Sequence, residues 1–290
     1  MILKKDQYVI NEKIPDWGIG KVIDIINKDR AKIFFEYGGY RTFVCKKNSL
    51  TEVTHSEVNT DSFMHINSET MSEEKKILYT DLLSLQKYFL QEFPGGFSGK
   101  KYHDNERDYK DEGHTFAIDM LNQKSFEEDL HAEDYGNIII RVLKVVNNLN
   151  LLFPNEKKVL RDGLKEEENQ KLFAQSLYNL LYGTDDFKDR FQEWIRTLAV
   201  IGADKWTIAS YFLFIVYPEK YMFVKPTITQ VAADMNAYPI AYTPGLNWNT
   251  YNKILMLSEY LKQNLQKLEP KDMIDVQSFM WCIVQSAKEK

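Results

Sequence analysis

A chain of 290 residues exceeds what one small core organises and suits a large domain joined to a small one. Hydrophobic residues make up 44% and include 17 Phe, 17 Tyr and 5 Trp, which excludes a mainly disordered chain. The net charge of −5 excludes a globally basic nucleic-acid binder. Residues 1–54 hold 10 Lys/Arg against 7 Asp/Glu, so any contact with a polyanion has to be local.

The termini, cysteines and histidines set expectations about location and cofactors. The N-terminus reaches Lys4, Lys5 and Asp6 without the apolar stretch of a signal peptide, so we expect a cytoplasmic protein. The apolar run 208–217 is shorter than the roughly 20 residues that cross a bilayer, so we expect no membrane partner. The only cysteines, Cys45 and Cys282, are far apart, and the five histidines lack metal-ligand spacing. We therefore expect no disulfide, no metal and no cofactor.

Residues 7–53 have the pattern of short strands, which we expect at 7–10, 21–26, 31–35 and 41–44. Polar residues 27–30 and the Gly38–Gly39 pair mark the turns between them. The run Asp-Trp-Gly-Ile-Gly-Lys-Val-Ile at 16–23, followed by residues 31–35 and the glycine pair, resembles the SH3/Tudor-like domains of bacterial repair helicases and transcription-repair coupling factors. The resemblance implies a small β-barrel at 1–55 that docks on a protein or nucleic acid without doing chemistry.

Residues 56–71 are polar and are expected to form a linker, followed by an all-α domain at 72–290. Thr70 and Glu73 have capping-box spacing, and an apolar helical stripe follows at Ile77, Leu78, Leu82, Leu85 and Phe89. Similar stripes within 138–149, 172–181, 187–198 and 251–265 predict amphipathic helices. Residues 206–217 are apolar nearly all round and are expected at the centre of the domain. The predicted fold class is α+β, mainly α.

Residues 198–218 and 221–235 read as helix, glycine turn, buried helix, extended loop and helix. This order resembles the helix-hairpin-helix DNA glycosylase superfamily. The resemblance implies that Gly202 is the hairpin glycine, that Lys205 lies near the lysine nucleophile of bifunctional members, and that 224–228 is the loop holding the catalytic Asp. Lys225 stands in the Asp position, where a cation opposes the positive charge that develops on the sugar.

The resemblance also implies DNA contacts from Gly202, Lys205, Lys225 and Thr227, and stacking of a base on Trp206. The alternative for the same stretch is an ordinary core helix capped by Asp204, with Trp206 in the core and both lysines solvated.

A second candidate site is the charged segment 102–114. Glu106 and Asp108 are candidate catalytic carboxylates, and Arg107 and Lys110 are candidates to hold phosphate. The alternative is a solvated loop entering a helix with acids in its first turn. The preceding glycine-rich stretch 94–101 lacks phosphate-loop spacing, which argues against nucleotide hydrolysis.

The C-terminal run 270–281 places Asp272 at a helix start, where capping explains it. Asp275 and Gln277 lie among apolar residues and need partners if they are buried, so Asp275 is a further candidate catalytic residue.

These patterns lead to two hypotheses. In the first, the protein binds duplex DNA that contains a modified base, extrudes the nucleotide and hydrolyses its glycosidic bond in repair or antiviral defence. In the second, it is a noncatalytic adaptor whose N-terminal barrel docks on a protein or nucleic acid.

Overall fold

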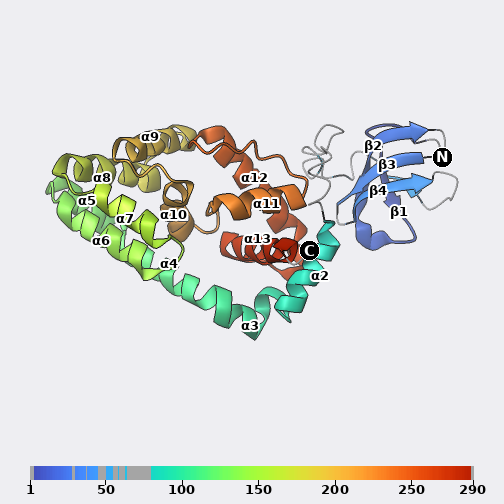
Figure 1. Cartoon of the computed structure of the whole chain (residues 1–290), viewed down its shortest axis with the longest axis horizontal. Coiled ribbons are helices and arrows are strands. Elements are labelled where there is room, and N and C mark those ends of the chain that lie inside the picture. The colour runs from blue at the N-terminus through green and yellow to red at the C-terminus, as the bar shows by residue number, and fades with distance from the viewer. Residues whose placement is uncertain are drawn as a thin grey trace.

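The computed structural model describes residues 3–27, 30–36, 38–44, 50–54, 58, 63 and 80–288. A small antiparallel sheet at the N-terminal end is followed by a much larger helical part (Figure 1). The predicted class, α+β and mainly α, is confirmed.

The sheet contains five strands in the order β4-β3-β2-β1-β5. The strands are β1 (Tyr8–Asn11), β2 (Ile19–Asn27), β3 (Arg30–Phe35), β4 (Gly39–Val44) and β5 (Leu50–Glu52). The four predicted strands are therefore confirmed, whereas β5 was not predicted. All four pairings are antiparallel, and β2 carries register shifts between Val22 and Asp24 and between Ile25 and Asn27, which bend the strand. Closure of this sheet into a barrel stays a prediction.

Each face of the sheet has its own apolar cluster, because successive side chains of a strand point to opposite faces. One face gathers Val9, Val22, Ala31, Ile33 and Phe35 with Trp17 packed against them. The other face gathers Tyr8, Ile23 and Phe34 and is covered by Phe63, only 1% of which is exposed. Phe63 comes from the segment predicted to be a linker, so at this position the segment packs on the sheet.

The helical part forms one continuous hydrophobic core that is separate from the two clusters of the sheet. Helices α4 to α10 form one group, and α2 with α11 to α13 forms a second group nearer the sheet (Figure 1). The longer helices are α2 (Leu82–Glu92), α4 (Asp108–Met120), α5 (Gln123–His131), α6 (Tyr135–Asn148), α7 (Pro154–Gly163), α8 (Glu167–Tyr182), α9 (Phe187–Val200), α10 (Trp206–Val216), α11 (Pro226–Met235), α12 (Trp248–Asn264) and α13 (Met273–Lys288).

The predicted apolar stripes lie on the core side of these helices. Every residue of α10 is buried, as expected for the helix that is apolar all round. Leu82, Leu85 and Phe89 are buried on α2, whose N-cap is Asp81. Leu172 is an exception in α8, with 37% of its surface exposed. Ile77, Leu78 and the Thr70–Glu73 capping box lie outside the described residues.

Polar contacts connect the start of α2 with both α11 and the sheet. The Thr80 amide donates to the Met235 carbonyl at 3.0 Å, and Arg41 of β4 pairs with Asp81 at 3.4 Å. The predicted boundaries near 55 and 72 fall where most residues are outside the described ranges, so the division into two domains stays a prediction. Among the described residues, no helix combines the length and the apolar character needed to cross a membrane.

Replacing Phe63 by Ala is expected to destabilise the sheet by about 3–5 kcal/mol, because a fully buried ring leaves a cavity behind. Ile26→Ala is the matched control, since 44% of Ile26 is exposed and its loss is expected to cost little. Urea unfolding followed by fluorescence measures both variants. Equal stability of Phe63→Ala and wild type would show that this ring does not anchor the segment to the sheet.

Candidate functional site

The charged segment forms the middle of a helical rod made of α3 (Lys100–Tyr102), η5 (His103–Arg107) and α4. Gly95, with φ of 85°, makes the tight turn that leads into the rod, so this glycine-rich stretch has a structural role. The five residues of η5 are a π-helix, and the wider turn shifts the side chains that follow it relative to a regular helix. The structure thereby directs Arg107 and Lys110 towards α13.

Arg107 is the centre of a buried ion network, the Arg107 cluster (Tyr102, Arg107, Asp111, Asp272 and Asp275). Its guanidinium contacts both oxygens of Asp272 at 2.8 and 2.7 Å and both oxygens of Asp111 at 2.9 and 2.8 Å. It also donates to Asp275 at 2.9 Å, and the Tyr102 hydroxyl donates to the same oxygen at 2.5 Å. These bonds join the rod to α13 across about half the chain.

Burial and charge pairing shift the pKa values of Arg107 and Asp111 in opposite directions. Burial disfavours the charged form of Arg107, yet hydrogen bonds to Asp272 and Asp111 hold its pKa above the ordinary value. Burial and the Asp275 charge raise the pKa of Tyr102, which keeps its hydroxyl protonated as a donor. For Asp111 burial is outweighed by the Arg107 hydrogen bond and charge, and its pKa is lowered. Its contribution to stability is therefore present above its ordinary pKa and is lost as the pH falls through the lowered value.

Lys110 forms a neighbouring network with Glu106 on the rod and with Gln277 and Ser278 on α13. Its ammonium donates to Glu106 at 2.8 Å, to Ser278 at 2.8 Å and to Gln277 at 3.2 Å. Burial lowers the pKa of Lys110, although the Glu106 charge opposes this shift. The three donors of the ammonium are thus all used by protein acceptors.

The burial of Arg107 and Lys110 contradicts both expectations for this segment, namely a phosphate-binding site and a solvated loop. Arg107 and Lys110 are 3% and 1% exposed, so they are neither solvated nor available to hold phosphate. Asp272 accepts from the Ile274 amide at 2.9 Å, so it caps α13 as predicted and also pairs with Arg107. Asp275 and Gln277 are buried with partners, as the apolar pattern around them required.

The three candidate carboxylates have different surroundings. Asp275 has 3% of its side chain exposed and already accepts from Tyr102, Arg107 and the Lys271 amide. Asp108 is 59% exposed and pairs with His103 at 2.8 Å. Glu106 has 19% of its side chain exposed and is held by Lys110. Of the three, Glu106 combines a fixed position with partial access to solvent.

The predicted hairpin is the turn between α9 and α10. The Ala203 amide donates to Leu198 O at 2.8 Å and the Gly202 amide to Ala199 O at 3.2 Å, which is the Schellman pattern at a helix C-terminus. Gly202 has φ of 70° and nothing within 4 Å of the place where a Cβ would be, so the turn is open outwards. Lys205 is exposed and is the N-cap of α10, with no capping side chain, so the predicted Asp204 cap is wrong.

Trp206 and Thr227 differ in their access to a ligand. Trp206 is 3% exposed, and its indole N–H donates to Thr243 O at 3.0 Å. The structure therefore corrects the expectation that Trp206 stacks on a base and supports its role in the core. Thr227 lies exposed in the first turn of α11.

Lys225 lies between two aromatic rings that no sequence pattern indicated. Its ammonium is 4.8 Å from the centre of the Phe153 ring and 5.1 Å from that of Trp281. Phe153 is 55% and Trp281 37% exposed. Together with Glu106, whose charge acts on the Lys225 ammonium, these residues are called the Lys225 cluster (Glu106, Phe153, Lys225 and Trp281). Lys225 is half-buried, which corrects the alternative in which it is solvated.

Burial lowers the pKa of Lys225, and the charges of Glu156 and Glu106 oppose that shift. Glu156 lies in the first turn of α7, where it accepts from the Phe153 amide at 2.7 Å and from the Thr207 hydroxyl at 2.7 Å. The starts of α7 and α10 therefore lie side by side, and Lys225 at the start of α11 reaches the Phe153 ring beside them.

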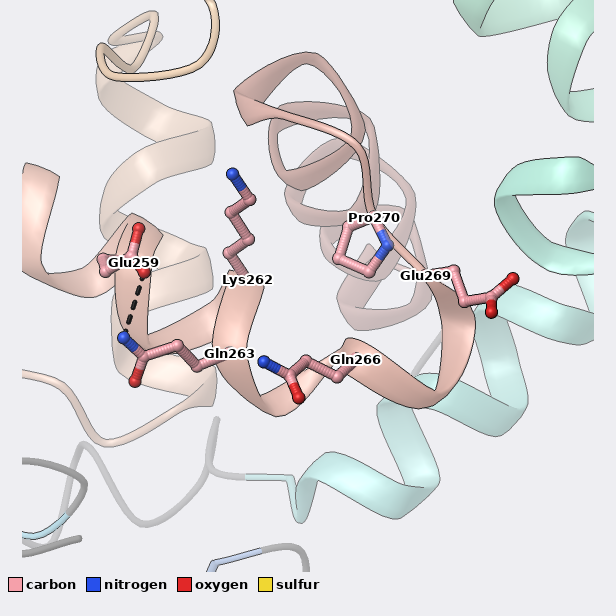
Figure 2. A pocket seen from close by; sticks show the side chains of 6 residues that line it. All are labelled: Glu259, Lys262, Gln263, Gln266, Glu269 and Pro270. Carbon is pink, nitrogen blue, oxygen red and sulfur yellow. Dashed lines mark hydrogen bonds between the residues drawn. The ribbon is translucent and has the colours of Figure 1, made fainter.

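A ligand site elsewhere on the described surface would need several polar side chains that point towards one place. A hollow of about 300 Å³ lies at the end of α12 and before α13 (Figure 2). Its polar side chains lie apart from one another, except that Gln263 donates to Glu259. No group of three His, Cys, Asp or Glu side chains in the described ranges is arranged to hold a metal ion. Cys282 is buried, whereas Cys45, His55 and His65 lie outside these ranges.

Replacing Arg107 by Met is expected to destabilise the protein by about 3–5 kcal/mol, because Asp272 and Asp275 would stay buried without their cation. Because Arg107 lowers the pKa of Asp111, the part of the loss that comes from this pair is present above the ordinary pKa of the carboxyl and disappears as the pH falls through the lowered value.

Lys100→Met is the matched control and is expected to cost little, since the Lys100 side chain is 88% exposed in its pair with Asp104. Urea unfolding at two pH values measures both. A loss in Arg107→Met no larger than in Lys100→Met would contradict the interpretation of this network as a buried clamp.

Comparisons with known proteins give no family for this chain. No protein-family model, no curated protein and no solved structure matches it. The two resemblances described from the sequence therefore stay predictions, and the function has to be inferred from the side chains of the Lys225 cluster and the turn beside it.

Proposed function

We propose that this protein binds DNA at the Gly202–Lys205 turn and removes a modified base at the Lys225 cluster. The observation that carries the proposal is the arrangement of two partly exposed rings, an ammonium and a fixed carboxylate beside an open turn that ends in an exposed lysine. The substrate class is duplex DNA with an altered base, and the reaction is hydrolysis of its glycosidic bond.

The turn supplies a place for the DNA backbone. Lys205 is an exposed cation at the N-cap of α10, a position that usually holds Ser, Thr, Asp or Asn. Helix N-termini carry partial positive charge, and no side chain caps α10 or α11. Lys205 and the exposed Thr227 hydroxyl therefore provide groups that suit phosphate oxygens on neighbouring helix starts.

The two rings and Glu106 suit an extruded nucleotide. Aromatic side chains stack on bases irrespective of sequence, and enzymes that act on a base first move it out of the duplex. Cleavage of the glycosidic bond develops positive charge on the sugar, which a nearby carboxylate stabilises. Lys225 is unsuited to that part, whereas Glu106 presents a carboxylate held by Lys110 on the same cluster.

A second candidate function is docking of a protein partner by the sheet, which we further propose to close into an SH3-like barrel. The observation that favours docking is a set of apolar side chains on the sheet and in the connection between β1 and β2 that are 38–44% exposed, namely Ile14, Ile25, Ile26 and Val44. Partner docking and DNA binding are compatible functions, because the two proposed sites lie on different parts of the chain.

Lys205→Ala is expected to weaken binding to duplex DNA and to reduce the slope of log affinity against log salt by about one unit, because one phosphate contact is lost. Lys188→Ala is the matched control, since Lys188 is exposed at the opposite end of α9 from the turn. Fluorescence anisotropy over a salt series measures both. If both variants bind like wild type with the same slope, the turn is not part of the interface.

Glu106→Gln is expected to lower the rate of base release on the order of a hundredfold or more, because the amide keeps the shape of the side chain but not its charge. Asp108→Asn, two residues further along the rod, is the control, and its rate is expected to stay near that of wild type, since Asp108 is exposed and pairs with His103. Release of free base from duplexes with different modified bases is the measurement. Full activity of Glu106→Gln together with an inactive Asp108→Asn would reverse this assignment, and wild type that binds DNA but releases no base would favour the adaptor.

A further inference from the structure

We infer that Lys225 restricts the Lys225 cluster to ligands that carry both a base and a phosphate. Its ammonium lies over the two rings on which a base would stack, 4.8 Å from the centre of the Phe153 ring and 5.1 Å from that of Trp281. The inference rests on the proposed function for the extruded nucleotide as the ligand. It deepens that function by naming the residue that selects nucleotides and rejects free bases and nucleosides.

The two rings begin on rigid parts of the fold. Phe153 directly precedes α7, and its amide donates to the Glu156 side chain at 2.7 Å. Trp281 lies on α13 between Met280 and Cys282, which are 1% and 5% exposed. The backbones that carry the rings are therefore fixed, whereas Phe153 and Trp281 are themselves partly exposed. A ligand can reach ring surface that the protein leaves open.

Lys225 combines a fixed backbone with a mobile side chain. The Val224 amide donates to the Ser210 hydroxyl at 2.8 Å, and the Lys225 carbonyl accepts from the Thr229 amide at 2.8 Å. Beyond this anchored backbone, a lysine side chain is a flexible four-carbon stem. The ammonium is therefore the part of the cluster that moves when a base approaches the rings.

The charges around the ammonium leave it available to an anion. Burial lowers the pKa of Lys225, while the charges of Glu156 and Glu106 favour its ammonium form. Both carboxylates already accept from other donors, Glu106 from the Lys110 ammonium at 2.8 Å and Glu156 from the Phe153 amide at 2.7 Å. A phosphate offers several charged acceptor oxygens and is therefore able to draw the ammonium off the rings.

The strengths of the competing contacts set the selectivity. Contact of a cation with an aromatic ring and stacking of a base on a ring are of similar strength. A nucleoside that displaces the ammonium therefore gains little, because the ammonium loses about as much as the base gains. A nucleotide gains more, since its phosphate takes up the displaced ammonium in a charge-assisted hydrogen bond. Base and phosphate together are thus expected to open the cluster, whereas neither does so alone.

The experiment follows the full chain by nuclear magnetic resonance with isotope-labelled lysine and tryptophan. Protons over the face of a ring resonate upfield, so the Lys225 ε-methylene signal reports whether the ammonium lies on the rings. The probes are deoxyguanosine, deoxyguanosine monophosphate and inorganic phosphate. In wild type only the monophosphate is expected to move this signal to the position of exposed lysines and to shift the Trp281 indole signal.

Three variants test which group causes the selectivity. Lys225→Ala leaves the rings open, so it is expected to bind deoxyguanosine on the order of tenfold more tightly than wild type and to lose the preference for the monophosphate. Lys225→Arg keeps a cation that stacks on aromatic rings and is expected to retain the preference. Lys220→Ala is the matched control, since Lys220 is exposed in the turn after α10, and it is expected to behave as wild type.

The inference is overturned if wild type binds deoxyguanosine and its monophosphate equally well or binds neither at the rings. It is also overturned if inorganic phosphate alone moves the Lys225 signal, or if Lys225→Ala binds deoxyguanosine no better than wild type does. The measurements on wild type do not depend on the folding of a variant.

A duplex with one unpaired guanosine separates the inference from the proposed function. It is expected to move the Lys225 signal at lower concentrations than the monophosphate does, because the turn adds backbone contacts. If the monophosphate moves the signal and the duplex does not, the selectivity stands and DNA is not the ligand. If the duplex moves the signal but no altered base is ever released, the selectivity stands and base removal fails.

Discussion

The contact on which the rest of the helical part depends is that of the Arg107 guanidinium with the carboxylates of Asp111, Asp272 and Asp275. Two of these acids come from the start of α13, more than 160 residues further along the chain. Taking such charges out of water is expensive, and a buried network of this kind is weak evidence for stability by itself. Its geometric demands are strict, however, because a bidentate pair fixes both distance and orientation. The network thus fixes α13 against the rod, and with α13 it fixes Ser278 beside Glu106 and Trp281 beside Lys225.

The proposed chemistry distributes its charges over different helices. In the resemblance described from the sequence, one loop position holds the carboxylate, and here that position holds Lys225. The structure offers a carboxylate to the same cluster from the rod, where Lys110 holds Glu106. In the proposed site the loop therefore carries an amine, and the carboxylate is supplied by the rod. The lysine is partly buried rather than freely solvated because two aromatic rings lie against its ammonium and a nearby negative charge stabilises it.

Local patterns predicted the elements well, and they predicted the site only in part. Strands β1 to β4 alternate clearly and are punctuated by glycine, whereas the three residues of β5 are too short to give a period of their own. The burial of Asp275 followed from its apolar neighbours, but its partner did not, because Arg107 is distant in sequence and a π-turn alters the spacing of its helix. Phe153 and Trp281 could not be paired with Lys225 from sequence, since three separate elements bring them together. A polar stripe on an otherwise apolar α13, at Asp272, Asp275 and Ser278, was the available signal that a charged partner packs against that helix.

The position of α13 has a consequence for the order in which the structure forms during synthesis. A ribosome makes Arg107 and Lys110 long before it makes Asp272, Asp275 and Ser278, so the nascent rod carries two cations whose final partners do not yet exist. Until α13 emerges, those side chains have to remain hydrated or be held by other groups, and the rod lacks the surface against which it later packs. The ring of Trp281 arrives later still, after every other member of the Lys225 cluster has been translated. Translation that stops short of α13 would therefore yield a chain without a complete Lys225 cluster, so a polypeptide able to act on DNA in the proposed way would exist only after α13 had docked.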